Sequence, residues 1–137
     1  MMKYATVSIL LEKKSVEVLK PEPAVLGSRD LCVVSPIDMV VKPGEVRNIP
    51  LGYSLILPKD TELVMYPKAG ANPSISIVFA NKGGVIDSKF REEVVVEVRN
   101  RRPAGSEPLR IHRGDKLGHI RLFPEGWIDL VVAKSQF

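Results

Sequence analysis

Short runs of β-branched and aromatic residues, each ended by a turn-forming cluster, are the feature of this sequence that most limits its fold. Runs such as "YSLIL", "SISIVF" and "EVVVEV" alternate with clusters such as "KPGE", "LPKD" and "NKGG". β-Branched and aromatic side chains favour strands, while Gly, Pro, Asn and Asp supply the backbone angles of tight turns. Helical periodicity is almost absent, so the pattern predicts an all-β sandwich or barrel.

The expected strands share this pattern of apolar residues bounded by turn residues. They cover residues 4–11, 30–34, 38–41, 46–51, 53–57, 62–66, 74–79, 93–98, 109–113, 117–123 and 127–133. The longest irregular stretch, residues 18–28, is expected to be a loop.

The length of 137 residues fits one compact domain, and we expect a single domain over residues 1–137. No apolar run approaches the roughly 18 residues of a membrane-spanning helix. The N-terminal "MMKYATVSILLEKK" lacks the small-residue cleavage site of a signal peptide. These features predict a soluble, intracellular protein of the cytoplasm or nucleus.

The net charge of +4 favours anionic partners such as phosphates, nucleotides and nucleic acids. Residues 99–113 concentrate arginines but contain no aromatic side chain for base stacking, so a solvated hairpin is favoured over nucleic-acid binding. The single cysteine, Cys32, is expected to be a buried, inert thiol. His112 and His119 are the two histidines, and the sequence predicts no zinc site and no catalytic triad.

Four turn-containing stretches occur in a recognisable order between about Asp30 and Phe123. They are "GSRDLCV", "VKPGEVRNIPLGYSLILPKD", "YPKAGANPSISIVFANKGGVIDSKFREEV" and "HRGDKLGHIRLF". In order and nearly in spacing, this arrangement resembles the trimeric dUTPase family. The resemblance implies a distorted, jelly-roll-like β-barrel, a homotrimer with sites at subunit boundaries, a deoxyuridine nucleotide as ligand, and Mg²⁺ as cofactor if the protein is active.

The "GGVID" stretch is the most specific part of the resemblance, which implies that Gly84, Val85 and Ile86 form the pocket for uracil and deoxyribose. Asp87 is then the catalytic base that orients the attacking water. Phe90 stands where the family usually has a tyrosine whose ring packs on the sugar. Asp30, Leu31 and the residues just before them match part of the family's first motif, so Asp30 is the second expected catalytic residue.

The phosphate-binding motifs depart from the family pattern. In "YPKAG", Lys68 replaces an arginine, Ala69 replaces a serine, and Gly70 is kept. Lysine supplies charge without the two-pronged guanidinium fork. His119 replaces a glutamine of the fourth motif, and a neutral imidazole can still donate one hydrogen bond. Glu92 replaces a glycine of the third motif and brings a carboxylate near the expected path of the triphosphate.

The sequence after Gly126, "WIDLVVAKSQF", contains no further glycine and no arginine, so the family's glycine-rich arm is not found. Because phosphoryl transfer depends on charge stabilisation around the phosphates, these changes predict lost or weakened dUTP hydrolysis and a role in nucleotide or protein binding. One alternative is an active, divergent, viral-type dUTPase in which Lys68, His119 and the basic loop of residues 99–113 supply the missing contacts.

Two further alternatives rest on other residues. A dCTP deaminase-like enzyme would use Glu97 as general base, whereas the simpler interpretation pairs Glu97 across strands with a lysine or arginine. An interaction module would bind a protein partner through residues 99–113 or through the C-terminal "KSQF".

Overall fold

The computed structural model describes residues 5–11, 17–23, 30–68 and 72–133, and these contain no α-helix. The elements are β1 (Ser8–Leu11), β2 (Glu22–Pro23), β3 (Leu31–Val34), β4 (Met39–Val41), β5 (Val46–Pro50), β6 (Tyr53–Ile56), β7 (Thr61–Pro67), β8 (Ile75–Phe79), the 3₁₀ turn η1 (Lys82–Gly84), β9 (Val85–Asp87), β10 (Val95–Asn100), β11 (Leu109–Ile111) and β12 (Lys116–Pro124). The all-β prediction is confirmed. Nothing in the described part of the chain is a helix able to cross a bilayer.

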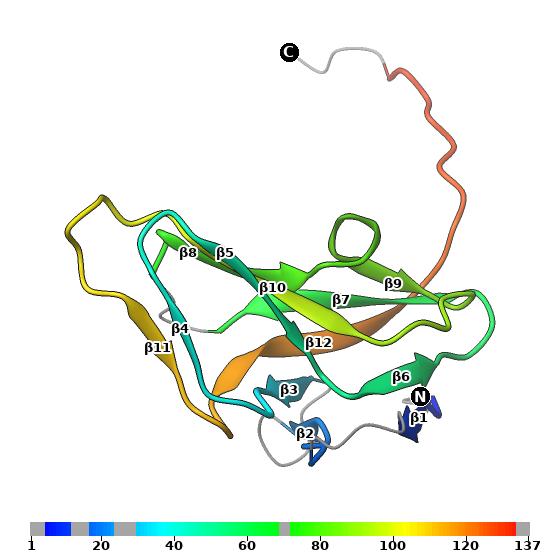
Figure 1. The fold of residues 1–137 in the computed structure, drawn as a ribbon. Coiled ribbons are helices and arrows are strands. Elements are labelled where there is room, and N and C mark those ends of the chain that lie inside the picture. The colour runs from blue at the N-terminus through cyan, green and yellow to red at the C-terminus, as the bar shows by residue number, and fades with distance from the viewer. Residues whose placement is uncertain (1–4, 12–16, 24–29, 69–71, 134–137) are drawn as a thin grey trace.

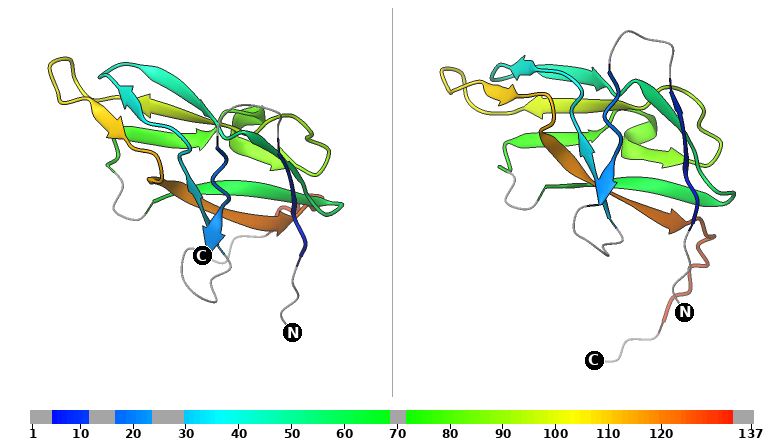
Figure 2. Two further views of the ribbon diagram at one scale, coloured as in Figure 1. Left: turned by 60° about the horizontal axis from the view of Figure 1, so that its bottom comes forward. Right: turned by 90° about the horizontal axis from the view of Figure 1, so that it is seen from below.

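Two sheets and two strand pairs enclose the interior (Figures 1 and 2). The larger sheet has the order β2-β3-β12-β7-β9, and the smaller has the order β5-β10-β8. β11 pairs with β4, and β1 pairs with β6. All pairings are antiparallel, as expected for strands joined mainly by tight turns.

The core follows from strict alternation of buried and outward side chains along the strands. On β10, Val96 and Val98 are fully buried, while the side chains between them lie half-buried on the outer face. Val96 is opposite Ile49 of β5 and Phe79 of β8, so the three side chains meet in one layer of the core. A shift of one residue would turn this whole layer outward, and the apolar pattern therefore fixes the register.

Several turn predictions are also confirmed by backbone geometry. In "KPGE", Gly44 has a φ of 84°, and Glu45 donates its N–H to the Lys42 carbonyl at 2.9 Å. In "HRGD", Gly114 has a φ of 91°, and Asp115 donates its N–H to the His112 carbonyl at 2.9 Å. Glycine accepts this left-handed backbone without a steric penalty, which is why both turns place it there.

The prediction of a strand at residues 127–133 is wrong for the single chain. Residues 125–133 form no strand, and Trp127, Ile128 and Val132 are almost completely exposed. A strand requires a neighbouring strand for its main-chain hydrogen bonds, and no described segment pairs with this tail. The strands β2 and β9 were not predicted, because they are too short to show the two-residue alternation of apolar and polar side chains.

The burial of Cys32 is confirmed, since its side chain is 2% exposed on β3. Glu97 lies on the outer face of β10 as predicted, but its partner was predicted wrongly. Glu97 Oε1 lies 3.2 Å from Nη2 of Arg99 on the same strand, because residues two apart on a strand share one face.

Gly118 marks the tightest packing between β12 and β7. A Cβ atom at this position would lie 2.7 Å from the Tyr66 carbonyl oxygen. We expect Gly118→Ala to reduce the free energy of unfolding by about 1–3 kcal/mol, as overpacking does elsewhere. Urea unfolding measures the change. The control is Gly126→Ala, where no atom lies within 4 Å of the added methyl group. Equal stability of the two variants would contradict the predicted clash.

Candidate active site

Strand β9 forms one edge of the five-stranded sheet and carries the "VID" residues. It follows η1, in which Gly83 and Gly84 have φ angles of 70° and 99° that other residues rarely adopt. On one side β9 pairs with β7, and on its other side no described strand pairs with it. The main-chain donors and acceptors on that side can therefore recognise the polar edge of a base, as the resemblance predicts.

Asp87 ends β9 and is fixed by the turn that it begins. Its Oδ1 accepts the Lys89 N–H at 2.9 Å, and its carbonyl oxygen accepts the Phe90 N–H at 3.2 Å. This is the local hydrogen bonding through which aspartate stabilises a turn. The carboxylate is half-buried and held in one orientation, as positioning a water molecule requires.

Two of the residues expected in the nucleotide pocket belong mainly to the core. Ile86 is fully buried and Phe90 is 6% exposed, and both pack in the central apolar cluster. Ile86 can therefore meet a ligand mainly through its main chain, and Phe90 presents little surface to a ligand. Val85 is half-buried and lies opposite Val64. The sugar contact of Phe90 stays a prediction.

Asp30 and His119 meet at the other end of β7, together with an arginine that the motifs did not indicate. Arg121 Nε donates to Asp30 Oδ1 at 2.6 Å, and Nη2 donates to Oδ2 at 3.2 Å. His119 Nδ1 lies 3.9 Å from Asp30 Oδ2. The hydrogen bond that Arg121 donates to Asp30 raises the pKa of the Arg121 guanidinium above its usual value, so this group keeps its charge. Arg121 could have been found because it follows His119 by two positions on one strand, which puts both on one face.

Aromatic rings brace this cluster from β7 and β12. The Arg121 Cζ lies 5.9 Å from the centroid of the Tyr66 ring, within range of a cation–π contact. Tyr66 in turn meets Phe123 edge-on, with ring centroids 6.4 Å apart and an interplanar angle of 63°. The guanidinium is thus held at one edge by a carboxylate and on one face by a ring.

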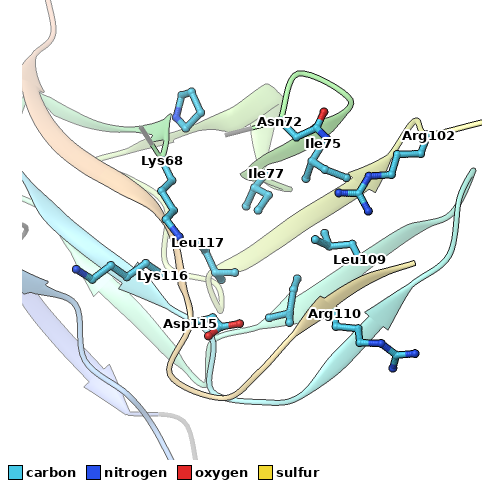
Figure 3. Close-up of a pocket in the computed structure, with 12 residues that line it drawn as sticks. Lys68, Asn72, Ile75, Ile77, Arg102, Leu109, Arg110, Asp115, Lys116 and Leu117 are labelled. Atoms are coloured by element: carbon cyan, nitrogen blue, oxygen red, sulfur yellow. The ribbon is translucent and has the colours of Figure 1, made fainter. Parts of the chain in front are cut away.

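Lys68 lies in a separate cavity of about 300 Å³ (Figure 3). Its side chain points toward Leu117 and Asp115, while His119 does not line this cavity. The floor is aliphatic, built from Ile75, Ile77, Leu109, Ile111 and Leu117. Lys68 and His119 therefore do not line a common cavity. Gly70 and Ala69 lie outside the described residues, and so do residues 27–29 of the first motif.

Within one chain, the expected catalytic and substrate-binding residues lie in two groups. Asp87 is opposite Glu62 of β7, whereas His119 is opposite Tyr66 of the same strand. Their backbones are therefore about 13 Å apart along the strands and about 10 Å apart across them. Asp30 and His119 come together, but Asp87 and Phe90 do not join them within one chain.

The described side chains form no cluster that would hold magnesium in the absence of a nucleotide. No group of three or more His, Cys, Asp or Glu side chains gathers among the described residues. Both carboxylate oxygens of Asp30 accept hydrogen bonds from Arg121. Mg²⁺ at nucleotide sites usually keeps several waters and is held by one or two carboxylates together with the phosphates of the substrate. Mg²⁺ as cofactor of an active enzyme therefore stays a prediction.

The arginine-rich stretch binds mostly to its own chain. Arg102 Nη1 donates to the Glu107 carbonyl at 3.1 Å, and Arg113 Nη1 donates to the Pro36 carbonyl at 2.9 Å. Arg113 also lies 3.3 Å from the Glu17 carboxylate. These contacts favour the solvated hairpin, and any role in binding a partner stays a prediction.

Comparison with known proteins shows the family to which this chain belongs. The dUTPase family matches residues 17–124. Deoxyuridine 5'-triphosphate nucleotidohydrolase of Haemophilus influenzae is 32% identical over 126 residues, covering 90% of this chain and 82% of that protein. The same-named protein of Desulfotalea psychrophila is 30% identical over 95 residues, covering 69% of this chain and 61% of that protein. This chain belongs to the dUTPase family.

Solved structures confirm the fold. A point mutant of the dUTPase of phage phi11 of S. aureus, described with a structural Mg(II) ion, aligns with a TM-score of 0.71 at 17% identity, covering 96% of this chain and 98% of that one. The native EIAV dUTPase aligns with a TM-score of 0.68 at 14% identity, covering 96% and 99%. The expected dUTPase-like β fold is thereby confirmed.

The Asp87 turn can be tested without a substrate. Asn keeps an oxygen that accepts the Lys89 N–H, whereas Ala removes it. We expect Asp87→Ala to speed amide hydrogen exchange at Lys89 by about tenfold, the loss of a net hydrogen bond of about 1.4 kcal/mol. Asp87→Asn is the matched control and should leave the exchange nearly unchanged. Slow exchange at Lys89 in the alanine variant would show that the side chain does not fix this turn.

Proposed function

We propose that this chain hydrolyses dUTP to dUMP and pyrophosphate. In this reaction water adds to the α-phosphorus, Asp87 accepts a proton from the water, and pyrophosphate leaves. The observation that carries the proposal is the geometry of Asp87, whose carboxylate is fixed by a turn at the end of β9, an edge strand that pairs with β7 among the described strands. The names of the family relatives support the same reaction.

A second candidate is nucleotide or protein binding with little or no turnover. It is favoured by two observations on the phosphate ligands. Lys68 points into the cavity beside Leu117, and Asp30 is engaged by Arg121. Loss of one preorganised donor can cost about 100-fold or more in rate, so displaced ligands would leave slow chemistry.

We also infer that the working unit is a homotrimer whose sites combine residues of different copies. Support comes from the separation of Asp87 and Phe90 from Asp30 and His119 within one chain. Further support comes from residues 125–133, an extended and exposed tail that carries Trp127 and four large aliphatic residues. Exposed apolar surface of this kind is typical of protein contacts, and a neighbouring copy can cover it.

The hydrolysis is tested by measuring pyrophosphate release from dUTP, with dCTP and dTTP as controls for the base. We expect turnover of dUTP alone, and Asp87→Asn should reduce the rate by about 100-fold or more because the base is lost. Asp60→Asn is the matched control, since Asp60 is exposed, has a φ of 57° that Asn tolerates, and lies outside both groups of expected site residues.

Equal rates for the wild type and Asp87→Asn would contradict the assigned role of Asp87. If the wild type binds the non-hydrolysable analogue dUpNHpp without releasing pyrophosphate from dUTP, the second candidate is correct. Absence of both dUpNHpp binding and dUTP turnover would reject hydrolysis and nucleotide binding and leave only the protein-binding form of the second candidate.

The trimer is tested by light scattering of the purified protein. We expect a mass of three times 15.2 kDa for the wild type. Trp127→Ser combined with Ile128→Ser should shift the protein toward monomer, because both side chains are almost fully exposed in one chain and need apolar cover. Asp129→Asn, on the same tail, is the control. A trimer that survives the double substitution would exclude the tail from the contact.

A further inference from the structure

We propose that Arg121 is a phosphate-binding residue of this chain and that Asp30 holds its guanidinium in place between ligands. The proposal rests on the proposed function in one respect, namely that the face carrying Asp30 and His119 meets the phosphates of a nucleotide. Neither the altered motifs nor the family comparison assigns a role to Arg121.

The position of Arg121 follows from strand geometry. His119 and Arg121 are two residues apart on β12, so their side chains leave the sheet on the same face. Asp30 binds Arg121 on this face and lies 3.9 Å from His119. Lys68, expected to supply the phosphate charge, points instead toward Leu117 (Figure 3). Arg121 therefore adds a guanidinium on the face of Asp30 and His119, whereas Lys68 lines the separate cavity.

The guanidinium is already oriented for a second acceptor. Arginine carries five N–H donors in a rigid plane, and Asp30 uses those of Nε and Nη2. Nη1 donates no hydrogen bond to the described residues, and the side chain is 42% exposed. The Tyr66 ring limits motion of the plane. Because the group is ordered before a ligand arrives, little conformational entropy is lost on binding.

Phosphate and Asp30 then compete for the same donors. A phosphate group accepts two parallel hydrogen bonds from one guanidinium, as a carboxylate does. When a phosphate binds, Arg121 either shares its Nη1 edge or exchanges Asp30 for the ligand. In both cases the Asp30 carboxylate lowers the net attraction for an anion, so Asp30 acts against phosphate binding while it orders the guanidinium.

The proposed role of Asp30 can be distinguished by experiment from a role in which Asp30 holds a magnesium ion. If Asp30 served to hold a divalent cation beside the phosphates, removing its charge would weaken phosphate binding. If Asp30 instead restrains Arg121, removing its charge would strengthen phosphate binding. The sign of the effect of Asp30→Asn therefore distinguishes the two arrangements.

The test is calorimetric titration of the full-length protein with inorganic tripolyphosphate, with and without Mg²⁺. We expect Arg121→Met to weaken binding at least about tenfold, as loss of a charged hydrogen bond does. Asp30→Asn should tighten binding several-fold, with no requirement for Mg²⁺. Arg110→Met is the control and should bind as the wild type does, since Arg110 is exposed and its guanidinium points away from the cavity in Figure 3.

Arg121→Lys is a second variant, included in case Arg121→Met does not fold. Lysine keeps the positive charge and the long aliphatic chain but lacks the planar guanidinium group. This variant should bind more weakly than the wild type while its far-UV circular dichroism is unchanged. Equal tripolyphosphate affinity in the wild type, Arg121→Met and Arg121→Lys would overturn the proposal. Weaker binding by Asp30→Asn would also overturn it, and weakening seen only with Mg²⁺ would favour a cation at Asp30.

Tripolyphosphate has no base, so its binding does not depend on the Asp87 pocket. Binding that requires Arg121, in a protein that neither binds nor hydrolyses dUTP, would support this proposal and reject the proposed function. Turnover of dUTP with an unchanged KM in Arg121→Met would do the reverse.

Discussion

The long antiparallel pairing of β7 with β12 is the contact on which the rest of the molecule depends. Its register runs without a break from Gly118 opposite Pro67 to Pro124 opposite Thr61. One face of this pair supplies core side chains such as Leu63 and Ile120, and the other carries Tyr66, His119 and Arg121. β3 joins β12 on one side and brings Asp30, while β9 joins β7 on the other and brings Asp87. The same ladder therefore holds the two halves of the proposed site apart.

The parts of the fold that could be predicted from the sequence are those with local causes. The alternation of valines with polar residues at 93–98 predicts a strand with one buried face. The glycine in "KPGE" and in "HRGD" predicts a turn residue with a positive φ angle. Asp87 was located by resemblance, and its capping of the Lys89 N–H agrees with its place at the end of β9. The tail at 127–133 was predicted as a strand because its composition suits one, but a strand also needs a neighbour.

The contacts that could not be predicted join residues far apart in the chain. The Asp30–Arg121 pair spans 91 positions, and no local pattern at either residue indicates the other. The orientation of Lys68 depends on a cavity built by β8, β11 and β12, so the motif "YPKAG" alone does not reveal it. A motif in the sequence thus shows which side chains are present, but the pairing of the strands determines which of them are in contact. A guanidinium on the paired strand β12 is also more rigidly placed than one on a loop.

The bare edge of β9 and the uncovered apolar tail have a joint consequence for the protein in solution. An unpaired strand edge is a template for further strands, and it promotes aggregation when nothing covers it. A chain that covers such surfaces only by meeting its own copies has a stability that rises with its concentration. Dilution would then expose the edge and the tail together, and newly made chains would pass through that exposed state before they find one another.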